Sequence, residues 1–160
     1  MILEATDEHY AGLLVGQVPD GLRLPDCPIE SDEILEFLRD LANSIRPSFA
    51  PASWLIVEDS EIVGLCSVIK PPTGDTIEIG YGIAACRRGR GAAGRAVGDL
   101  LEWARGDERV RYVRAENAIG NPASQAVLER NGFERTGRRL DPEDGEVICW
   151  LAAAGEESRG

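Results

Sequence analysis

The sequence has a single histidine, His9, and this scarcity excludes most metal and nucleophile sites that depend on imidazole. Its four cysteines, at positions 27, 66, 86 and 149, are widely separated and form no C-x-x-C pair. This spacing argues against a zinc site or a disulfide scaffold. We therefore expect reduced thiols and no bound metal, with His9 as an ordinary polar residue near the first helix.

Long hydrophobic runs and basic residues are also scarce. No segment approaches the roughly 18 apolar residues of a membrane-spanning helix, and the N-terminus shows no basic region followed by an apolar signal segment. Lysine and arginine total 17 against 28 acidic residues, which gives a net charge of -11. A nucleic-acid-binding surface needs a broad basic face, which this balance disfavours. These absences predict a cytoplasmic protein with no membrane or nucleic-acid partner.

Against this acidic background, residues 87–96 form a cluster rich in arginine and glycine, Arg-Arg-Gly-Arg-Gly-Ala-Ala-Gly-Arg-Ala. Apolar residues alternate as in a strand over 76–83 and recur at helical spacing over 93–104. A glycine-rich loop therefore leads into a helix N-terminus, where backbone N–H groups and the helix dipole attract anions. The loop predicts a phosphate-binding site.

The arginines of this cluster have different expected roles. Arg88 and Arg90 lie in or beside the loop and add positive charge toward a phosphate. Arg87 and Arg95 are candidates for pairing with surface acids.

Two familiar phosphate signatures do not fit. A P-loop would continue with Gly-Lys-Ser/Thr, which this sequence lacks after its glycines. A dinucleotide-binding fold would place its glycines after the first strand, whereas several elements precede this loop.

The loop and its neighbours instead resemble the GNAT acyltransferase superfamily. Residues 88–93 match the Arg/Gln-x-x-Gly-x-Gly/Ala signature with which that family holds the pyrophosphate of acetyl-coenzyme A (acetyl-CoA). Glu-Ile-Gly-Tyr at 78–81 and Leu-Leu-Glu-Trp-Ala at 100–104 resemble the flanking strand and helix of the branch of ribosomal-protein N-terminal (Rim-type) acetyltransferases. Asn-Pro-Ala-Ser at 121–124 and the Leu-Glu-x-x-Gly-Phe pattern at 128–133 resemble the same branch. The resemblance covers residues 50 to 151 well and the first fifty loosely.

The order of elements predicts an α+β fold in a single domain of 1–151 with a C-terminal tail of 152–160. We expect helices over 7–14, 31–45, 93–104 and 121–131. Strands are expected over 2–6, 54–57, 62–69, 76–83, 109–116, 133–136 and 146–151. The resemblance implies a central mixed, mainly antiparallel sheet, flanked by helices, in which the strands 76–83 and 109–116 splay apart.

The resemblance also implies where acetyl-CoA binds. Its pantetheine arm would lie in the splay, beside Tyr81, Gly82, Ile83 and Asn121. Its pyrophosphate would lie on the loop formed by Arg88, Gly89, Arg90, Gly91, Ala92, Ala93 and Gly94.

Acetyl transfer to an amine needs a proton acceptor for the amine and a proton donor for the departing thiolate. Glu78, on the strand beside the splay, and Glu116, at the end of the facing strand, are the candidate acceptors. Each has an alternative as a solvated carboxylate or as the partner of a nearby arginine. Ser124 is the candidate donor by resemblance, with a locally bonded helix hydroxyl as its alternative. Many family members place a tyrosine acid where this chain has Leu128.

These observations lead to one preferred function and two alternatives. We expect an enzyme that transfers an acetyl group from acetyl-CoA to a primary amine, in a ternary complex and without a metal. The acceptor would be a protein N-terminus or a small amine, and the protein a monomer or homodimer. The alternatives are a non-catalytic acyl-CoA binding or sensor domain and a nucleotide-binding protein that uses the loop for another diphosphate.

Overall fold

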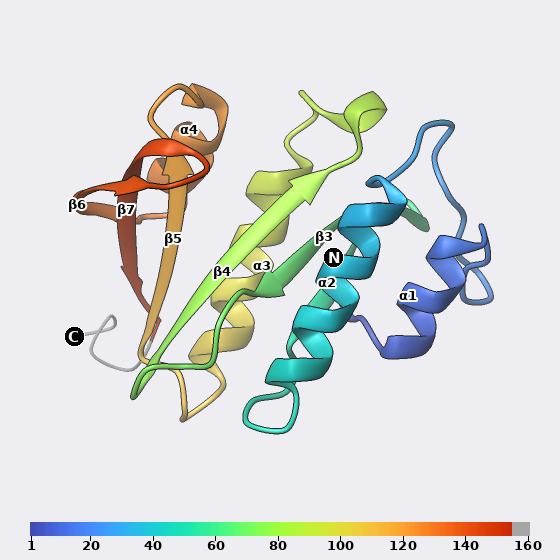
Figure 1. The fold of residues 1–160 in the computed structure, drawn as a ribbon, viewed down its shortest axis with the longest axis horizontal. Helices are drawn as coiled ribbons and strands as arrows, with labels where there is room; N and C mark the ends of the chain where they lie inside the picture. Colours follow the sequence, from blue (N-terminus) through green and yellow to red (C-terminus); the bar gives the residue numbers. More distant parts are fainter. Residues whose placement is uncertain (155–160) are drawn as a thin grey trace. The chain divides into compact units, whose positions relative to one another are not determined.

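A computed structural model describes residues 1–154 of the chain. Over this range it contains four α-helices, one short 3₁₀-helix and seven strands (Figure 1). The helices are α1 (Asp7–Leu14), α2 (Asp32–Ile45), α3 (Ala92–Arg105) and α4 (Pro122–Arg130), and the 3₁₀-helix is η1 (Ala85–Arg87). The strands are β1 (Ile2–Glu4), β2 (Ser53–Glu58), β3 (Glu61–Val68), β4 (Thr76–Ile83), β5 (Tyr112–Ala118), β6 (Glu134–Asp141) and β7 (Gly145–Ala153).

The strands follow the order β1-β2-β3-β4-β5-β7-β6. The β1–β2, β2–β3, β5–β7 and β6–β7 pairs are antiparallel, whereas β4 and β5 are parallel. The predicted α+β class with a mixed, mainly antiparallel sheet is therefore confirmed. The chain divides into two compact units, Met1–Pro71 with Gly80–Ala96 and Pro72–Ile79 with Val97–Gly160. We describe each unit by itself.

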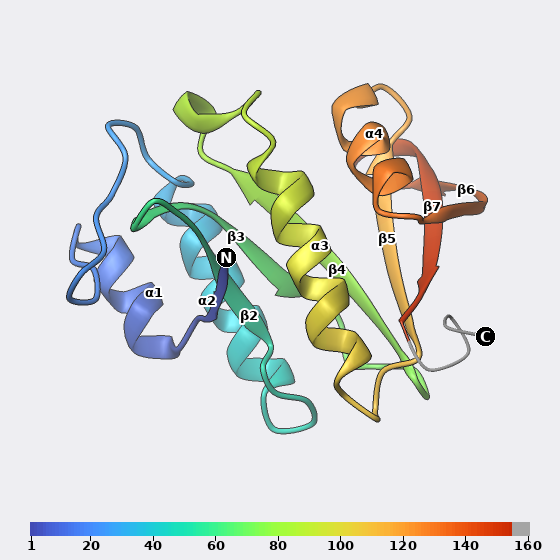
Figure 2. The ribbon, with the colours of Figure 1, turned by 180° about the vertical axis from the view of Figure 1, so that it is seen from behind.

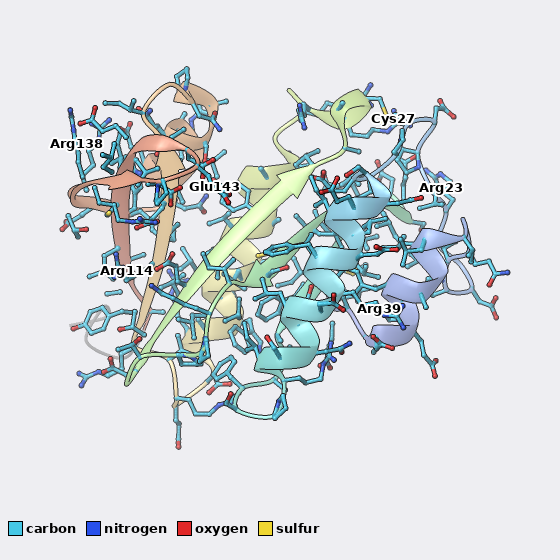
Figure 3. All side chains as sticks on the ribbon, viewed as in Figure 1. Arg23, Cys27, Arg39, Arg114, Arg138 and Glu143 are labelled. Atoms are coloured by element: carbon cyan, nitrogen blue, oxygen red, sulfur yellow. A yellow bond between two sulfur atoms is a disulfide. The ribbon has the colours of Figure 1, made fainter. Side chains whose placement is uncertain are left out.

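In the first unit, α1 and α2 lie side by side, and α2 covers one face of β3 (Figures 1 and 2). Ser31 caps α2, because its hydroxyl accepts a hydrogen bond from the Ile34 N–H at 3.2 Å. Arg39, labelled in Figure 3, joins the two helices through bonds of 2.7 and 2.9 Å to the carboxylate of Asp7. His9 accepts a bond from the Thr6 N–H and so completes the capping box of α1.

A buried hydroxyl cluster joins α1 to the strands of this unit. The Tyr10 hydroxyl lies 2.5 Å from that of Ser53, which also donates to the Cys66 carbonyl at 3.3 Å. Tyr10 and Ser53 are both inaccessible to solvent, and burial raises the pKa of the tyrosine. The hydrogen bonds offset the cost of burying these polar groups.

In the second unit, the parallel ladder joins Thr76–Ile79 of β4 to Tyr112–Ala115 of β5. It includes only the first four residues of each strand, although β4 runs to Ile83 and β5 to Ala118. This short ladder agrees with the predicted strand pair that separates along its length.

The second unit also contains an antiparallel β5-β7-β6 sheet with α4 on one face (Figures 1 and 2). The Asn121 side chain caps α4 by accepting from the Ser124 N–H at 3.1 Å, and Pro122 occupies the first turn. Gly132, at φ +83°, follows the helix in the left-handed conformation. These residues bound a helix that lies within the predicted range 121–131.

Several element boundaries differ from the sequence-based expectations. Strand β5 begins at Tyr112 rather than 109, β6 extends to Asp141, and β7 continues to Ala153, past the predicted start of the tail at 152. Pairing with β7 extends β6 to Asp141, and pairing with β5 extends β7 to Ala153. Both strands are longer than their apolar patterns suggest, because main-chain bonds need no apolar side chain. Residues 155–160 of the predicted tail lie outside the described residues. No helix within 1–154 is long and apolar enough to cross a membrane.

The expectation of four reduced thiols is wrong for two cysteines. Cys27 and Cys86 form a disulfide across 59 positions, between the segment that precedes α2 and η1 (Figure 3). Sequence spacing could not show this pairing, because only the fold of the first unit brings the two positions together. Cys66 and Cys149 are free and buried.

We predict that reduction of the Cys27–Cys86 bond lowers the free energy of unfolding by about 2–4 kcal/mol, because the bond restricts a long loop of the unfolded chain. Denaturant unfolding with and without reductant measures the difference. The Cys27→Ser/Cys86→Ser double variant should be insensitive to reductant, whereas Cys66→Ser should respond as the parent does. Equal midpoints for the oxidised and reduced parent would contradict the prediction.

Candidate active site

The glycine-rich loop lies between η1 and α3 in the first unit. Gly89 and Gly91 adopt φ values of +79° and +80°, which residues with side chains rarely reach. The first hydrogen bond of α3 runs from the Arg95 N–H to the Gly91 carbonyl at 3.1 Å, so the N–H groups of Ala92 to Gly94 precede it. The predicted helix N-terminus therefore forms where the sequence indicates, with a backbone that only glycine accommodates easily.

Arg88 and Arg90 are placed differently from the arginines around them. Arg88 donates from Nε to the Ile83 carbonyl at 3.0 Å, which ties the loop to the end of β4. Arg90 is exposed and forms no ion pair or side-chain hydrogen bond within residues 1–154. Its guanidinium charge is therefore available to an anion.

Arg87 and Arg95 are both paired with acids, as one interpretation of the sequence anticipated. Arg87 makes two bonds, of 2.6 and 3.1 Å, to the buried carboxylate of Glu61 and thereby lowers the pKa of that group. Arg95 donates from Nε to Glu58 at 2.9 Å. A cavity of about 340 Å³ lies among these groups, with Arg90 on its wall.

The end of β4 carries the predicted pantetheine-binding residues Tyr81, Gly82 and Ile83, also in the first unit. It approaches β3 very closely: a Cβ placed on Gly64 would lie 2.2 Å from the Gly82 carbonyl oxygen. Only glycine fits at position 64, and the sequence analysis did not single it out. Gly64 is an isolated glycine inside a strand pattern, and such a glycine indicates that another backbone approaches closely.

Glu78 lies in the second unit, on the part of β4 that pairs with β5. It is only 5% exposed, and its Oε1 lies 4.0 Å from the Nε of Arg114. The alternative of a solvated strand-end carboxylate is therefore wrong, because the group is buried beside an arginine.

Glu116, on β5, is held by a bidentate arginine. Arg139 donates to its two carboxylate oxygens at 2.7 and 2.5 Å, and the Cys149 thiol donates at 3.4 Å. The bonds from Arg139 lower the pKa of Glu116, against a smaller opposing effect of desolvation. A carboxylate stabilised in this way is a weaker proton acceptor.

Ser124 occupies the first turn of α4, where it ends a chain of side-chain hydrogen bonds. Trp150 donates from Nε1 to the Asn117 Oδ1 at 3.2 Å, and the Asn117 Nδ2 donates to the Ser124 hydroxyl at 3.4 Å. Because an indole N–H can only donate, it fixes which end of the buried amide faces Ser124. The serine oxygen accepts from Asn117, so its own proton points elsewhere. Sequence reasoning missed Asn117.

The first unit thus brings together the loop residues 88–94 and the end of β4. The second unit contains Glu78, Glu116, Asn121 and Ser124. No group of three or more potential metal ligands occurs in the part of the chain that the structure describes.

A family model for the acetyltransferase (GNAT) domain matches residues 1–134 of the chain. No protein of curated function matches the sequence significantly.

Three solved structures illustrate the similarity of fold. RimL, a ribosomal protein alpha-N-acetyltransferase in complex with coenzyme A, is 20% identical with a TM-score of 0.71, covering 95% of this chain and 92% of its own. An aminoglycoside acetyltransferase in complex with coenzyme A is 17% identical with a TM-score of 0.69, covering 100% and 99%. A spermidine N-acetyltransferase chimera from Vibrio cholerae and hSSAT is 15% identical with a TM-score of 0.68, covering 96% and 95%. At these identities the likeness shows a common fold.

We predict that Arg139→Met raises the pKa of Glu116 toward the ordinary carboxyl value of about 4.3. In the parent, the ionised Glu116 carboxylate adds to the free energy of unfolding above the pKa of the unfolded state. This contribution is lost as the pH falls through the lowered pKa of the native state. As the pH is lowered, the free energy of unfolding of Arg139→Met should therefore fall less than that of the parent. A carboxyl-carbon NMR titration measures the pKa, and Arg138→Met, which removes the neighbouring partner of Glu146, is the control. An unchanged Glu116 titration in Arg139→Met would contradict the assignment.

Proposed function

Since this chain belongs to the GNAT acetyltransferase family, we propose that it transfers the acetyl group of acetyl-CoA directly to a primary amine in a ternary complex. The protein is an acetyl-CoA dependent N-acetyltransferase. The proposal concerns the acceptor of the acetyl group and the catalytic residues. The observation that carries the proposal is the loop of left-handed glycines at the start of α3, with Arg90 beside it. This backbone fits a diphosphate, and the family match supports coenzyme A as the molecule that supplies it.

The residues of the first unit fit the donor. Left-handed Gly89 and Gly91 leave the backbone accessible, and the first N–H groups of α3 supply donors for phosphate oxygens. Tyr81, Gly82 and Ile83 are the proposed partners of the pantetheine arm, by their place in the family motif, and so is Asn121 in the second unit. The side chain of Asn121 already caps α4, so any bond from it to the donor would use its remaining amide N–H groups.

For the chemistry, we assign a base and an acid from the second unit. The amine nitrogen attacks the thioester carbonyl and loses a proton to a carboxylate, and the carbon–sulfur bond breaks. The departing thiolate then takes a proton, for which Ser124 is the proposed donor. Of the two carboxylates, Glu116 is the weaker acceptor because Arg139 stabilises its charge. The proposal therefore gives the base role to Glu78.

The proposed acceptor is a primary amine. The structural neighbours carry names that refer to a ribosomal protein, to aminoglycosides and to spermidine. These names support an amine acceptor and do not distinguish among a protein N-terminus, an amino sugar and a polyamine.

We predict that the parent binds acetyl-CoA in calorimetric titration, and binds ATP and NAD far more weakly. Gly89→Ala and Gly91→Ala should each weaken acetyl-CoA binding at least about tenfold, because a Cβ is strained at positive φ and, at position 91, would lie 2.7 Å from the Arg95 Nη1. The control is Gly74→Ala, which has a similar φ of +61° and open space around it, away from the loop.

Absence of acetyl-CoA binding by the parent would overturn the proposed function. Sound binding without release of coenzyme A on a panel of amines and peptides would favour the non-catalytic sensor.

We predict that Glu78→Gln lowers kcat by about 10²-fold or more, the typical contribution of a general base, and that Glu116→Gln has a smaller effect. Ser124→Ala should slow turnover without weakening acetyl-CoA binding. Release of free thiol over a range of pH measures these rates, and Glu134→Gln, on the exposed surface of β6, is the matched control. Unchanged rates in both Glu78→Gln and Glu116→Gln would remove the general-base assignment.

A further inference from the structure

The first unit contains a second cavity, of about 200 Å³, lined by α2, β3 and the end of β4. Ile34 and Leu38, one helical turn apart, come from α2, and Leu65 and Ile69 come from β3 and the residue that follows it. Ile34 is 43% exposed, so the α2 side of the cavity meets solvent. These walls favour an apolar group.

The Glu30 carboxylate lies among these apolar walls. Glu30 comes just before Ser31, the cap of α2, and a Cβ placed on Gly82 would lie only 3.2 Å from the Glu30 Oε1. Among the residues that line the cavity, all of them in the described chain, Glu30 is the only charged one. Ser67 and Tyr81 add hydroxyl groups. The cavity therefore combines one negative charge with mainly apolar walls.

Glycine keeps the strand side of the cavity open. Gly80 and Gly82 both line it, and their alternation places them on one face of β4. A Cβ at Gly80 would lie 3.1 Å from the Ile69 Cγ2, and one at Gly82 would meet Glu30. A side chain at either position would fill space that a ligand can use.

The charge and the size of the cavity limit its ligand. An ammonium that donates to the carboxylate gains an ion pair in addition to the hydrogen bond, whereas a neutral hydroxyl of the same shape gains only the hydrogen bond. The volume is below the roughly 300–1,000 Å³ of pockets for drug-sized ligands, so only a short group fits inside. A second cationic group on the same ligand would find no second carboxylate on these walls.

We infer that this cavity binds a primary ammonium carried on a short apolar group, with Glu30 as its counter-ion and Ile34 and Leu38 against the apolar part. The inference rests on the proposed acetyl transfer and specifies its acceptor. Gly82 borders the cavity and belongs to the segment proposed to hold the thioester arm, so acceptor and donor sites meet at the end of β4. A small aliphatic amine and the first residue of a peptide both present this chemistry.

The test is binding in the absence of acetyl-CoA, followed by NMR at the amides of Gly80, Tyr81 and Gly82. We expect 3-methylbutylamine to bind the parent at least tenfold more tightly than 3-methylbutan-1-ol, which has the same shape without the charge. Glu30→Gln should weaken amine binding about tenfold to a hundredfold and weaken alcohol binding much less, because only the amine loses an ion pair. The control is Glu33→Gln, an exposed acid of the first turn of α2 that does not line the cavity.

A second pair of variants tests the apolar walls. Ile34→Trp should narrow the cavity and weaken both ligands, and the partial exposure of Ile34 lets the larger side chain be accommodated. Phe37→Trp, at a 63% exposed position that does not line the cavity, should weaken neither. The tripeptide Leu-Gly-Gly and spermidine identify the source of the ammonium: binding of the peptide supports a protein N-terminus, and its exclusion supports a free amine.

Three results would overturn the inference: equal binding of amine and alcohol, no effect of Glu30→Gln, or tighter binding of spermidine than of 3-methylbutylamine. Calorimetry with acetyl-CoA separates this failure from failure of the proposed function. If the parent and Glu30→Gln bind acetyl-CoA equally while the amine result fails, only the acceptor assignment is wrong. If the parent does not bind acetyl-CoA, the proposed function itself is wrong.

Discussion

The two halves of β4 have different neighbouring strands, and the proposed sites depend on this division. Its first half, Thr76–Ile79, forms a parallel ladder with β5, and that ladder ends after four pairs. Its second half, Gly80–Ile83, belongs to the first unit, where the Gly82 carbonyl comes so close to β3 that position 64 must be glycine. Where β4 leaves the β5 ladder, its backbone polar groups need other partners, and Gly80 to Gly82 are only partly buried. The proposed donor and acceptor sites both lie on this second half.

The arginines near the glycine-rich loop also differ in their surroundings. In a chain of net charge -11, the arginines near the loop differ in their pairing. Arg87 pairs with Glu61 and Arg95 pairs with Glu58, whereas Arg90 makes no ion pair within residues 1–154, although its charge helps to lower the pKa of Glu61. The pairing holds η1 and the first turn of α3 against the β2–β3 hairpin. Arg90, beside the loop backbone, keeps its guanidinium exposed. An acidic protein can in this way bind a polyanion at one place.

The disulfide adds a covalent constraint to the same region. Cys86 lies one residue before Arg87, and Cys27 lies three residues before Glu30. The bond therefore fixes the segment that leads into α2 against the segment that leads into the glycine loop. The long segment before α2 has little regular structure to position it, so the cross-link substitutes for packing.

The sequence by itself determined the elements and the donor loop, because those follow from local rules. Hydrophobic period placed α3, the predicted range 121–131 contains α4, and the closely spaced glycines before α3 favour the observed left-handed backbone. It also nominated Glu78 and Glu116 but could not rank them, since only β6 and β7 bring Arg139 and Cys149 to Glu116. The disulfide, the Trp150–Asn117–Ser124 chain and the cavity beneath Glu30 were decided by tertiary structure alone. Each joins residues far apart in the sequence, and a pattern of neighbours along the chain carries no record of contacts that only folding creates.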